Sequence, residues 1–505
     1  MLGAQRVQKR RSTGCEACRK KKVKCGEERP RCRRCTRHQT GCRYPDPLDV
    51  DFRNENDKVA VRAANMWRQR AANVETSNEK SVARPEIDTK CVAHAHAYGD
   101  LHSGGLQATA LAKFYQDFGC IAHKSKPWMG FFQMLPDLYT NASDATSFSH
   151  AILAVSLANL ARKQGVPEAT ILARTEYCKA IKLVDQELRQ LDGKPSTNVL
   201  VSIILMSLFE TLISGSMDDN NTSRMTHIHG AIAMLQQVKP GLSEPVIDGR
   251  LLNIIYFHMV IHCLRKRLQP PLPLQMWTSQ LDPSLPGPRL FGLMYRLGKA
   301  QADIDLVMAQ SSSGDNEARE RINLLIGAMQ MMGQELKEWE ASLPPNFIFS
   351  IRDITPEDHA MLHWAGAPRT IYSYESFWVS IPRTLCFALQ TMLNWNLLEY
   401  SKAISKWEPG PGSWPVHCAT TRNKIVEMIH HICQSVALML NIPTNSNEEY
   451  EMQQAESIRG LIMMWPLSVA STALNDSEVL EQVGRETATW LTNVLQHARD
   501  LIGVA

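Results

Sequence analysis

The sequence predicts a mostly α-helical chain that carries a small cysteine-rich module near its N-terminus. Two observations predict the helical part: from about residue 107 apolar residues recur with helical spacing, and alternating strand patterns are scarce. A third observation predicts the module, because six of the 13 cysteines crowd into residues 15–42. We expect four segments: a basic arm at 1–14, the cysteine module at 15–45, a linker, partly helical or disordered, at 46–105, and one all-α domain at 106–505.

The crowded cysteines repeat one spacing twice. The pattern is C-x2-C-x6-C-x6-C-x2-C-x6-C, formed by Cys15, Cys18, Cys25, Cys32, Cys35 and Cys42. Zinc prefers four ligands in a tetrahedron, and thiolates suit it well. Six sulfurs can serve two zinc ions if two of them bridge both metals, and the first cysteines of the two halves, Cys15 and Cys32, are the natural candidates. A single four-cysteine site would leave Cys25 and Cys42 unexplained, and a metal-storage peptide would need no basic insert.

Charge is distributed very unevenly along the chain. Residues 1–45 hold 15 Lys and Arg against 3 Asp and Glu, a formal charge of +12. The remaining 460 residues hold 40 basic and 48 acidic side chains, a formal charge of −8. Such asymmetry predicts a basic, nucleic-acid-binding head on a mildly acidic body. Double-stranded DNA is therefore the expected partner.

The module resembles the fungal zinc binuclear cluster domain, in which six cysteines hold two zinc ions. Residues 15–25 read CEACRKKKVKC, close to the family's C-x-x-C-R-x-R/K-K-x-K-C, and Pro30 occupies the position of the family's proline before the fourth cysteine. The resemblance implies two Zn²⁺ per chain. It also implies the ligand sets, which are Cys15, Cys18, Cys25 and Cys32 for one zinc, and Cys15, Cys32, Cys35 and Cys42 for the other.

The resemblance also implies how the module contacts DNA. Its first half would form a short helix for the major groove, where Lys or Arg pairs best with guanine. In the family a lysine of this helix contacts a CGG-type triplet, so Lys22 and then Lys21 are the expected base-reading residues. Phosphate contacts are expected from five other basic residues of the two halves, namely Arg19, Lys24, Arg33, Arg34 and Arg37.

The sequence predicts a soluble protein of the nucleus without a membrane span. The first eleven residues are polar and basic, so no secretory signal is expected. Their charges, Arg6, Lys9, Arg10 and Arg11, would serve flanking phosphates or nuclear import. The longest apolar stretch, Val199–Phe209, is shorter than the roughly 20 residues that a bilayer requires, and we expect it to be a buried helix.

The linker does not predict a strong dimerising coiled coil. The best heptad register places Val59, Ala63 and Met66 on one seam and fails at Arg70. A helix near 54–74 is plausible, and the protein would bind DNA as a monomer or as a homodimer joined through the α domain.

The remaining metal-type side chains are expected to be structural. Cys91, His94 and His96 lie close in sequence but lack an evident fourth ligand. The cysteines outside the module show no ligand spacing and would act as small hydrophobic residues; they are Cys91, Cys120, Cys178, Cys263, Cys386, Cys418 and Cys433.

Helical stripes in the C-terminal region predict a packed core. They are Tyr177, Ile181, Val184 and Leu188; Ile322, Leu325, Ile326, Met329, Leu336 and Trp339; and Leu491, Val494, Leu495, Ala498 and Leu501. Three short motifs, Tyr177–Ala180, Ser207–Glu210 and His229–Ala231, make residues 106–240 similar to the fungal-specific transcription factor regulatory domain. We expect about a dozen helices packed as antiparallel pairs.

No catalytic motif is present, so the chain is not expected to be an enzyme. Glu210, His227 and His229 are expected to have packing or capping roles. The leading hypothesis is a sequence-specific regulator of transcription by RNA polymerase II that contacts the transcription machinery. The family's usual mode favours activation, and its usual setting is a metabolic or secondary-metabolite gene cluster. An enzyme with an accessory zinc module and a protein-interaction module are the alternatives, and the lysine-rich insert argues against the second.

Overall fold

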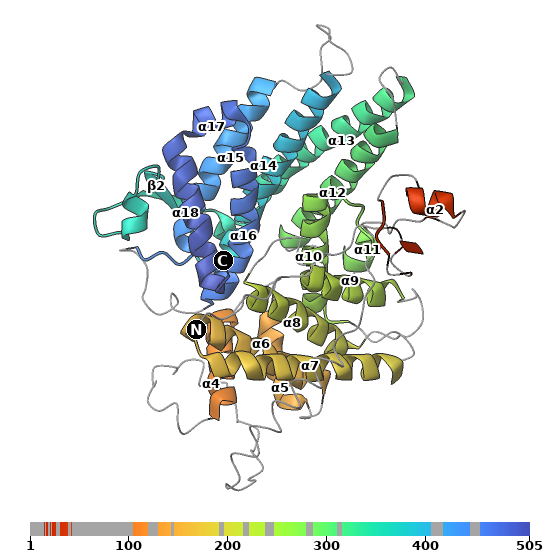
Figure 1. The fold of residues 1–505 in the computed structure, drawn as a ribbon. Coiled ribbons are helices and arrows are strands. Elements are labelled where there is room, and N and C mark those ends of the chain that lie inside the picture. The colour runs from red at the N-terminus through yellow and green to blue at the C-terminus, as the bar shows by residue number, and fades with distance from the viewer. Residues whose placement is uncertain are drawn as a thin grey trace, which may run out of the picture. The chain divides into compact units, whose positions relative to one another are not determined.

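The computed structural model divides the chain into two compact units, Met1–Ala83 and Arg84–Ala505. The residues that it describes are 15, 17–18, 21, 23–26, 31–38, 42, 105–119, 130–142, 146–190, 196–215, 222–237, 247–278, 286–310, 316–405, 418–444 and 455–504. The described residues of the first unit include the six crowded cysteines and one short helix that is described throughout, α2 (Arg33–Arg37) (Figure 1).

The second unit is almost entirely helical in its described residues, as the sequence predicts. Its first eight helices are α4 (Gly105–Phe118), α5 (Phe131–Asn141), α6 (Ser147–Gln164), α7 (Pro167–Gln190), α8 (Thr197–Ser214), α9 (Thr222–Gln236), α10 (Gly249–Lys266) and α11 (Leu274–Thr278). Local chemistry sets several of their ends. The side chains of Thr146 and Asp248 accept backbone N–H bonds at the starts of α6 and α10, and Gly165 ends α6 in the left-handed conformation.

The second half of this unit continues with seven more helices. They are α12 (Pro286–Gln310), α13 (Asn316–Ala341), α14 (Phe377–Ser405), α15 (Cys418–Met439), α16 (Glu456–Ala473), α17 (Ser477–Val483) and α18 (Arg485–Ile502). Helices that follow one another in sequence pack side by side, as α12 does with α13 and α14 with α15. Helix α16 packs against both α14 and α18 (Figure 1).

A small β-hairpin, which no sequence pattern predicted, interrupts the helices. Strand β1 (Ser350–Asp353) pairs antiparallel with β2 (Thr370–Ser373), and Ile351 lies opposite Tyr372. Two 3₁₀ turns, Pro345–Phe347 and Ala360–His363, accompany the strands. Each strand has only four residues and no tight Asn-Gly turn joins them, so neither of the usual sequence signals of a hairpin is available.

Helix α8 is the most apolar element of the unit. Its 18 residues extend beyond the Val199–Phe209 stretch, and by length and composition it could cross a membrane; 67% of it is buried inside the fold. It is the one such helix among the described residues. Ser202 and Thr211 donate their hydroxyls to carbonyls one turn earlier, at 2.7 and 3.1 Å, so both are satisfied within the helix. The prediction of a buried helix is confirmed, although the helix is longer than expected.

Three fully buried tryptophans join distant parts of the helical unit. Trp277 donates its indole N–H to the Asn253 side chain at 2.6 Å. Trp339 donates to the Pro286 carbonyl at 2.9 Å, and Trp490 donates to the Met361 carbonyl at 3.0 Å. Because each N–H is paired, these large side chains are buried without an unsatisfied donor. The predicted stripes around Ile322–Trp339 and Leu491–Ala498 lie in α13 and α18 and supply much of the same core.

Candidate metal centre and nucleic-acid interface

The core of the first unit consists of sulfur. The Sγ atoms of Cys15, Cys18, Cys32 and Cys35 all lie within 4.8 Å of one another, and all four side chains are buried. Cys15 and Cys32, the two candidates for bridging ligands, have no exposed surface. Cys25 and Cys42 pack at the edge of this group together with Ala17 and Val23.

The internal repeat of the sequence is also a repeat of hydrogen bonds. In the first half the backbone N–H of Cys15 donates to Cys25 Sγ at 3.4 Å. In the second half the backbone N–H of Cys32 donates to Cys42 Sγ at 3.3 Å. In each half, the backbone of the first cysteine is therefore hydrogen-bonded to the sulfur of the third. The sulfur of Cys32 also caps α2, because it accepts the N–H of Cys35 at 3.4 Å.

The sulfur spacing fits zinc. Tetrahedral ligands with Zn–S bonds of about 2.3 Å lie about 3.8 Å apart. The Sγ–Sγ distances from Cys15 are 3.8 Å to Cys32 and 3.6 Å to Cys35, and that from Cys18 to Cys32 is 3.8 Å. The Cys18 thiol also interacts with Cys25, and Cys42 interacts with Cys15 and Cys32. The Cys18 thiol also interacts with Cys35, which the resemblance places in the other ligand set. The contacts therefore do not separate the two sets, and the assignment of individual ligands stays a prediction.

Two thiols of this unit have pKa values that are shifted in opposite directions. Burial, followed by the neighbouring thiols, raises the pKa of Cys18. The backbone N–H of Cys35 has the opposite effect on Cys32 and lowers the pKa of that thiol to about 6. Since zinc binds thiolates, loading the site with metal releases the protons that such thiols hold.

Basic side chains surround the sulfur core on the outside. Lys21 and Lys24 in the first half are exposed, as are Arg33, Arg34 and Arg37 on α2. The turn of chain after Cys18 is closed by backbone bonds from Lys21 to Ala17 and from Val23 to Cys18, at 3.2 and 3.0 Å. Arg19 and Lys22 lie outside the described residues, as do Pro30, the basic arm, the zipper register at 59–70 and the Cys91–His96 group.

One polar cluster joins two of the three motifs of the helical domain to His227, which lies beside the third motif. Tyr177 of α7 donates its hydroxyl to Glu210 of α8 and contacts His227 Nε2 of α9 at 2.8 Å. The Tyr177 ring stacks on Phe209 with centroids 4.1 Å apart. Burial, reinforced by Glu210, raises the pKa of Tyr177, and burial lowers the pKa of His227 to about 4. His229 is exposed, so the two histidines face differently, and the cluster joins three helices as a packing device.

The cysteines of the helical unit that the structure describes are dispersed. Cys263, Cys386 and Cys433 are buried in the core, Cys418 is partly buried, and Cys178 is exposed on α7. Among the described residues, the one cluster of three or more metal-type side chains is formed by Cys15, Cys18, Cys32 and Cys35. The buried positions of Cys263, Cys386 and Cys433 fit the expected role of small hydrophobic residues, whereas the exposed position of Cys178 does not. Cys91 and Cys120 lie outside the described residues.

The fold and the sulfur site together define a zinc-cluster regulator with a helical body, and comparison with known families gives the same class. Residues 13–50 match the fungal Zn(2)-Cys(6) binuclear cluster domain, and residues 111–498 match the fungal-specific transcription factor domain. The second match covers most of the chain, so the chain belongs to the fungal-specific transcription factor family. Its module is of the type that binds two zinc ions through six cysteines. Both domains are those of transcription regulators rather than of enzymes.

Curated relatives match over short segments. The chain is similar to the transcription factor lfc1 of Flammulina velutipes, with 54% identity over 37 residues, which is 7% of this chain and 13% of that protein. It is similar to the peroxisome proliferation transcriptional regulator of Saccharomyces cerevisiae, with 37% identity over 70 residues, which is 13% of this chain and 7% of that protein. It is also similar to the Zn(2)-C6 fungal-type transcription factor afumD of Aspergillus fumigatus, with 43% identity over 47 residues, which is 9% of this chain and 13% of that protein. The matches thus span a small part of each relative. No solved structure matches the chain.

Proposed function

We propose that the chain is a sequence-specific RNA polymerase II transcription factor that reads CGG-like triplets through its zinc cluster. In this proposal the DNA-binding module is residues 15–45 and the regulatory domain is residues 106–505. All six module cysteines, Cys15, Cys18, Cys25, Cys32, Cys35 and Cys42, bind zinc. The base-reading residues are Lys22 and Lys21.

One observation carries this proposal. The sulfur atoms are turned inward, while the described basic side chains of the same unit are exposed. A module that only stored metal would need no such shell of positive charge. A basic surface held rigid by metal can instead neutralise DNA phosphates and present lysines to the major groove.

Replacement of Lys22 by alanine tests the base-reading role. One base contact contributes about 1–3 kcal/mol of discrimination, so the preference for a CGG site over a scrambled site should fall roughly tenfold or more. Fluorescence anisotropy of the full-length protein with both duplexes at one salt concentration measures the ratio. An unchanged ratio would remove Lys22 from the base-reading role.

Arg19→Ala is the matched variant, because Arg19 is assigned to a phosphate. It should weaken both duplexes about equally and reduce the slope of log K against log salt by roughly one. Lys24, Arg33, Arg34 and Arg37 are expected to behave in the same way. If Arg19→Ala changed the ratio between the two duplexes and left the salt slope alone, the two assignments would have to be exchanged.

The remaining features of the proposal concern the cell. We place the protein in the nucleus, as its family implies, with import through the basic residues near the N-terminus. It acts as an activator that contacts the transcription machinery, binds DNA as a monomer or as a homodimer joined through its α domain, and controls a metabolic or secondary-metabolite gene cluster. Genome-wide mapping of its binding sites, together with expression in a deletion strain, tests these statements. Two triplets at fixed spacing would support the dimer, and genes that rise in the deletion strain would make it a repressor.

A further inference from the structure

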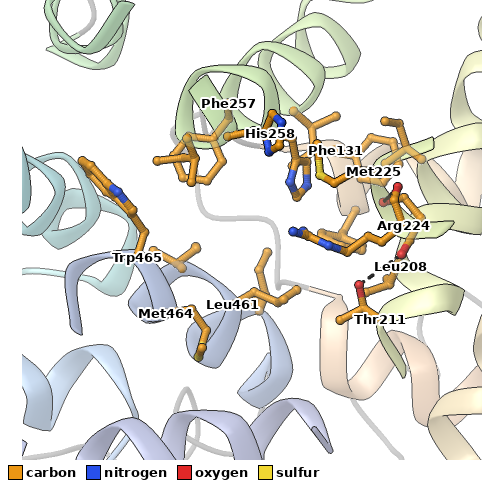
Figure 2. Close-up of a pocket in the computed structure, with 18 of the residues that line it drawn as sticks. Phe131, Leu208, Thr211, Arg224, Met225, Phe257, His258, Leu461, Met464 and Trp465 are labelled. Atoms are coloured by element: carbon orange, nitrogen blue, oxygen red, sulfur yellow. Dashed lines mark hydrogen bonds between the residues drawn. The ribbon is translucent and has the colours of Figure 1, made fainter. Parts of the chain in front are cut away.

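The helical unit encloses a cavity that none of the sequence motifs indicated. Its volume is about 440 Å³, within the range of ligand pockets in proteins. Five helices supply most of its wall: α5, α8, α9, α10 and α16. Figure 2 shows Phe257 and Trp465 on one side, Leu461 and Met464 along α16, and Phe131 and Met225 opposite them. The body of the cavity is therefore apolar.

Charge in this cavity has a single sign. The charged side chains that line it are Arg224, Arg265 and Arg499, and none of its described lining residues is acidic. Arg224 is only 7% exposed, and its guanidinium reaches from α9 toward the middle of the cavity (Figure 2). Arg265 is exposed and Arg499 is partly exposed, so the positive charge extends to the solvent side.

Two further polar groups, the imidazole of His258 and the indole of Trp465, line the cavity. Burial, and then the positive charge of Arg224, lowers the pKa of His258 to about 3, so this imidazole is neutral at physiological pH and can donate a hydrogen bond without adding charge. The indole N–H of Trp465 has no hydrogen-bond partner among the described residues, although the side chain is 5% exposed. A buried donor without a partner is uncommon in proteins and is satisfied when a ligand supplies an acceptor.

We propose that this cavity binds a free amphipathic monocarboxylic acid, with its carboxylate on Arg224 and its apolar body between α10 and α16. The planar guanidinium matches a carboxylate in a bidentate manner. The apolar wall excludes a small hydrophilic anion as the best ligand, because most of the burial available there is hydrophobic. The absence of acidic lining residues among those described disfavours a cation. The proposal goes beyond the DNA-binding function and does not depend on it.

The first arm of the test measures ligand class on the full-length protein. The fluorescent anion 1-anilinonaphthalene-8-sulfonate serves as the probe, and dodecanoate, dodecan-1-ol and dodecyltrimethylammonium compete with it below their micelle concentrations. Dodecanoate should displace one probe per chain and bind at least tenfold more tightly than the alcohol, with the cation weakest. Equal displacement by acid and alcohol, or no displacement by any of them, would overturn the proposal.

The second arm locates the site. Arg224→Gln should weaken dodecanoate about tenfold or more and leave dodecan-1-ol nearly unchanged, since a hydrogen bond to a charged group is lost. Leu461→Trp should weaken both ligands by filling the cavity. Arg289→Gln, an arginine that is 49% exposed on α12 and absent from the lining, should change neither.

Circular dichroism of each variant shows whether the helical unit remains folded. If Arg224→Gln does not fold, Arg224→Lys replaces it and should retain part of the preference for the acid. An unchanged ratio of acid to alcohol in a folded Arg224 variant would place the carboxylate elsewhere and refute the site. Because no DNA is present, these results are independent of the Lys22 experiment.

Discussion

The two units of the chain are stabilised by different means. In its described residues the cysteine unit packs Ala17, Val23 and its own sulfur atoms, which is too little apolar surface for independent folding. The helical unit instead buries a continuous core of aliphatic and aromatic side chains that runs from Ala110 to Val504. One chain thus combines a metal-dependent fold with a burial-dependent fold, and each should respond to a different perturbation.

Removal of a bridging ligand should have the largest effect. Cys15→Ser removes a sulfur that would serve both zinc ions, so the variant should lose zinc-coupled folding free energy on the order of 10 kcal/mol. We expect the variant to lose its zinc and its DNA binding while the main thermal transition of the helical unit stays unchanged. Elemental analysis and calorimetry measure the two properties. Two zinc ions per chain in the variant would contradict the bridging role of Cys15. A shifted helical transition would show that the two units are not stabilised independently.

A core tryptophan should give the converse result. Trp490 is 1% exposed, and its replacement by alanine should lower the free energy of unfolding of the helical unit by about 3–5 kcal/mol. The zinc content should remain that of the parent protein. Trp364→Ala is the control, because Trp364 is 45% exposed and the expected change is within about 0.5 kcal/mol. Denaturant unfolding followed by circular dichroism would distinguish the two, and equal losses would contradict the described core.

A buried carboxylate provides a pH-dependent test of the helical unit. Asp476 caps α17 and accepts hydrogen bonds from Lys402 at 2.8 Å and from Arg422 at 3.2 Å. Burial raises the pKa of Asp476, but the Lys402 hydrogen bond, the backbone N–H of Val479 and the two positive charges outweigh burial and hold it below its ordinary value. The ion pairs therefore stabilise the fold above the unfolded pKa of about 3.9, and this contribution disappears as the pH falls through the lower, folded value.

Asp476→Asn should remove that dependence. At neutral pH the variant should lose about 1–3 kcal/mol of unfolding free energy, because two charged donors lose their charged acceptor. The difference between variant and parent should shrink as the pH falls toward about 3. Urea unfolding at several pH values measures it. A difference that grows toward acid pH would have the wrong sign for this ion-pair cluster.

A cysteine of the helical unit should have the smallest effect. Cys178 is exposed on α7 and lies in none of the metal-type clusters found among the described residues. Cys178→Ser should change the unfolding free energy by no more than about 0.5 kcal/mol and leave the zinc content unaltered. Taken with Cys15→Ser, this variant separates cysteine as a metal ligand from cysteine as an ordinary side chain. Loss of zinc in Cys178→Ser would reveal a role that neither sequence nor structure indicates.

Sequence reasoning succeeded where the pattern is local. The spacing of the cysteines indicated the sulfur core, and the stripes at Ile322–Trp339 and Leu491–Ala498 indicated α13 and α18. It underestimated the length of α8, because the polar residues Thr197, Asn198 and Glu210 that flank the apolar run also belong to the helix. The serines within the run are satisfied by hydrogen bonds. In the fold Ser202 bonds within its own helix and Ser207 bonds to the Arg224 carbonyl, at 2.7 and 3.3 Å.

Features assembled from distant parts of the chain could not be predicted. Tyr177, Glu210 and His227 were each recognised within or beside motifs, but only packing of three helices reveals that they touch. The cavity was still harder to predict, since its walls come from residues spread between 131 and 499, and no short sequence motif indicates a binding site there. Arg224 alone in a sequence reads as a solvated surface charge.

The burial of α8 also bears on how the chain is made. This helix packs mainly against α6, α7 and α9, so its cover comes from the flanking segments between Ser147 and Gln236. A ribosome delivers those segments in succession, and contacts between neighbours in sequence form sooner than contacts between distant ones. The segment most attractive to membranes and to other nascent chains can thus be enclosed once about residue 236 has emerged, long before synthesis reaches α18.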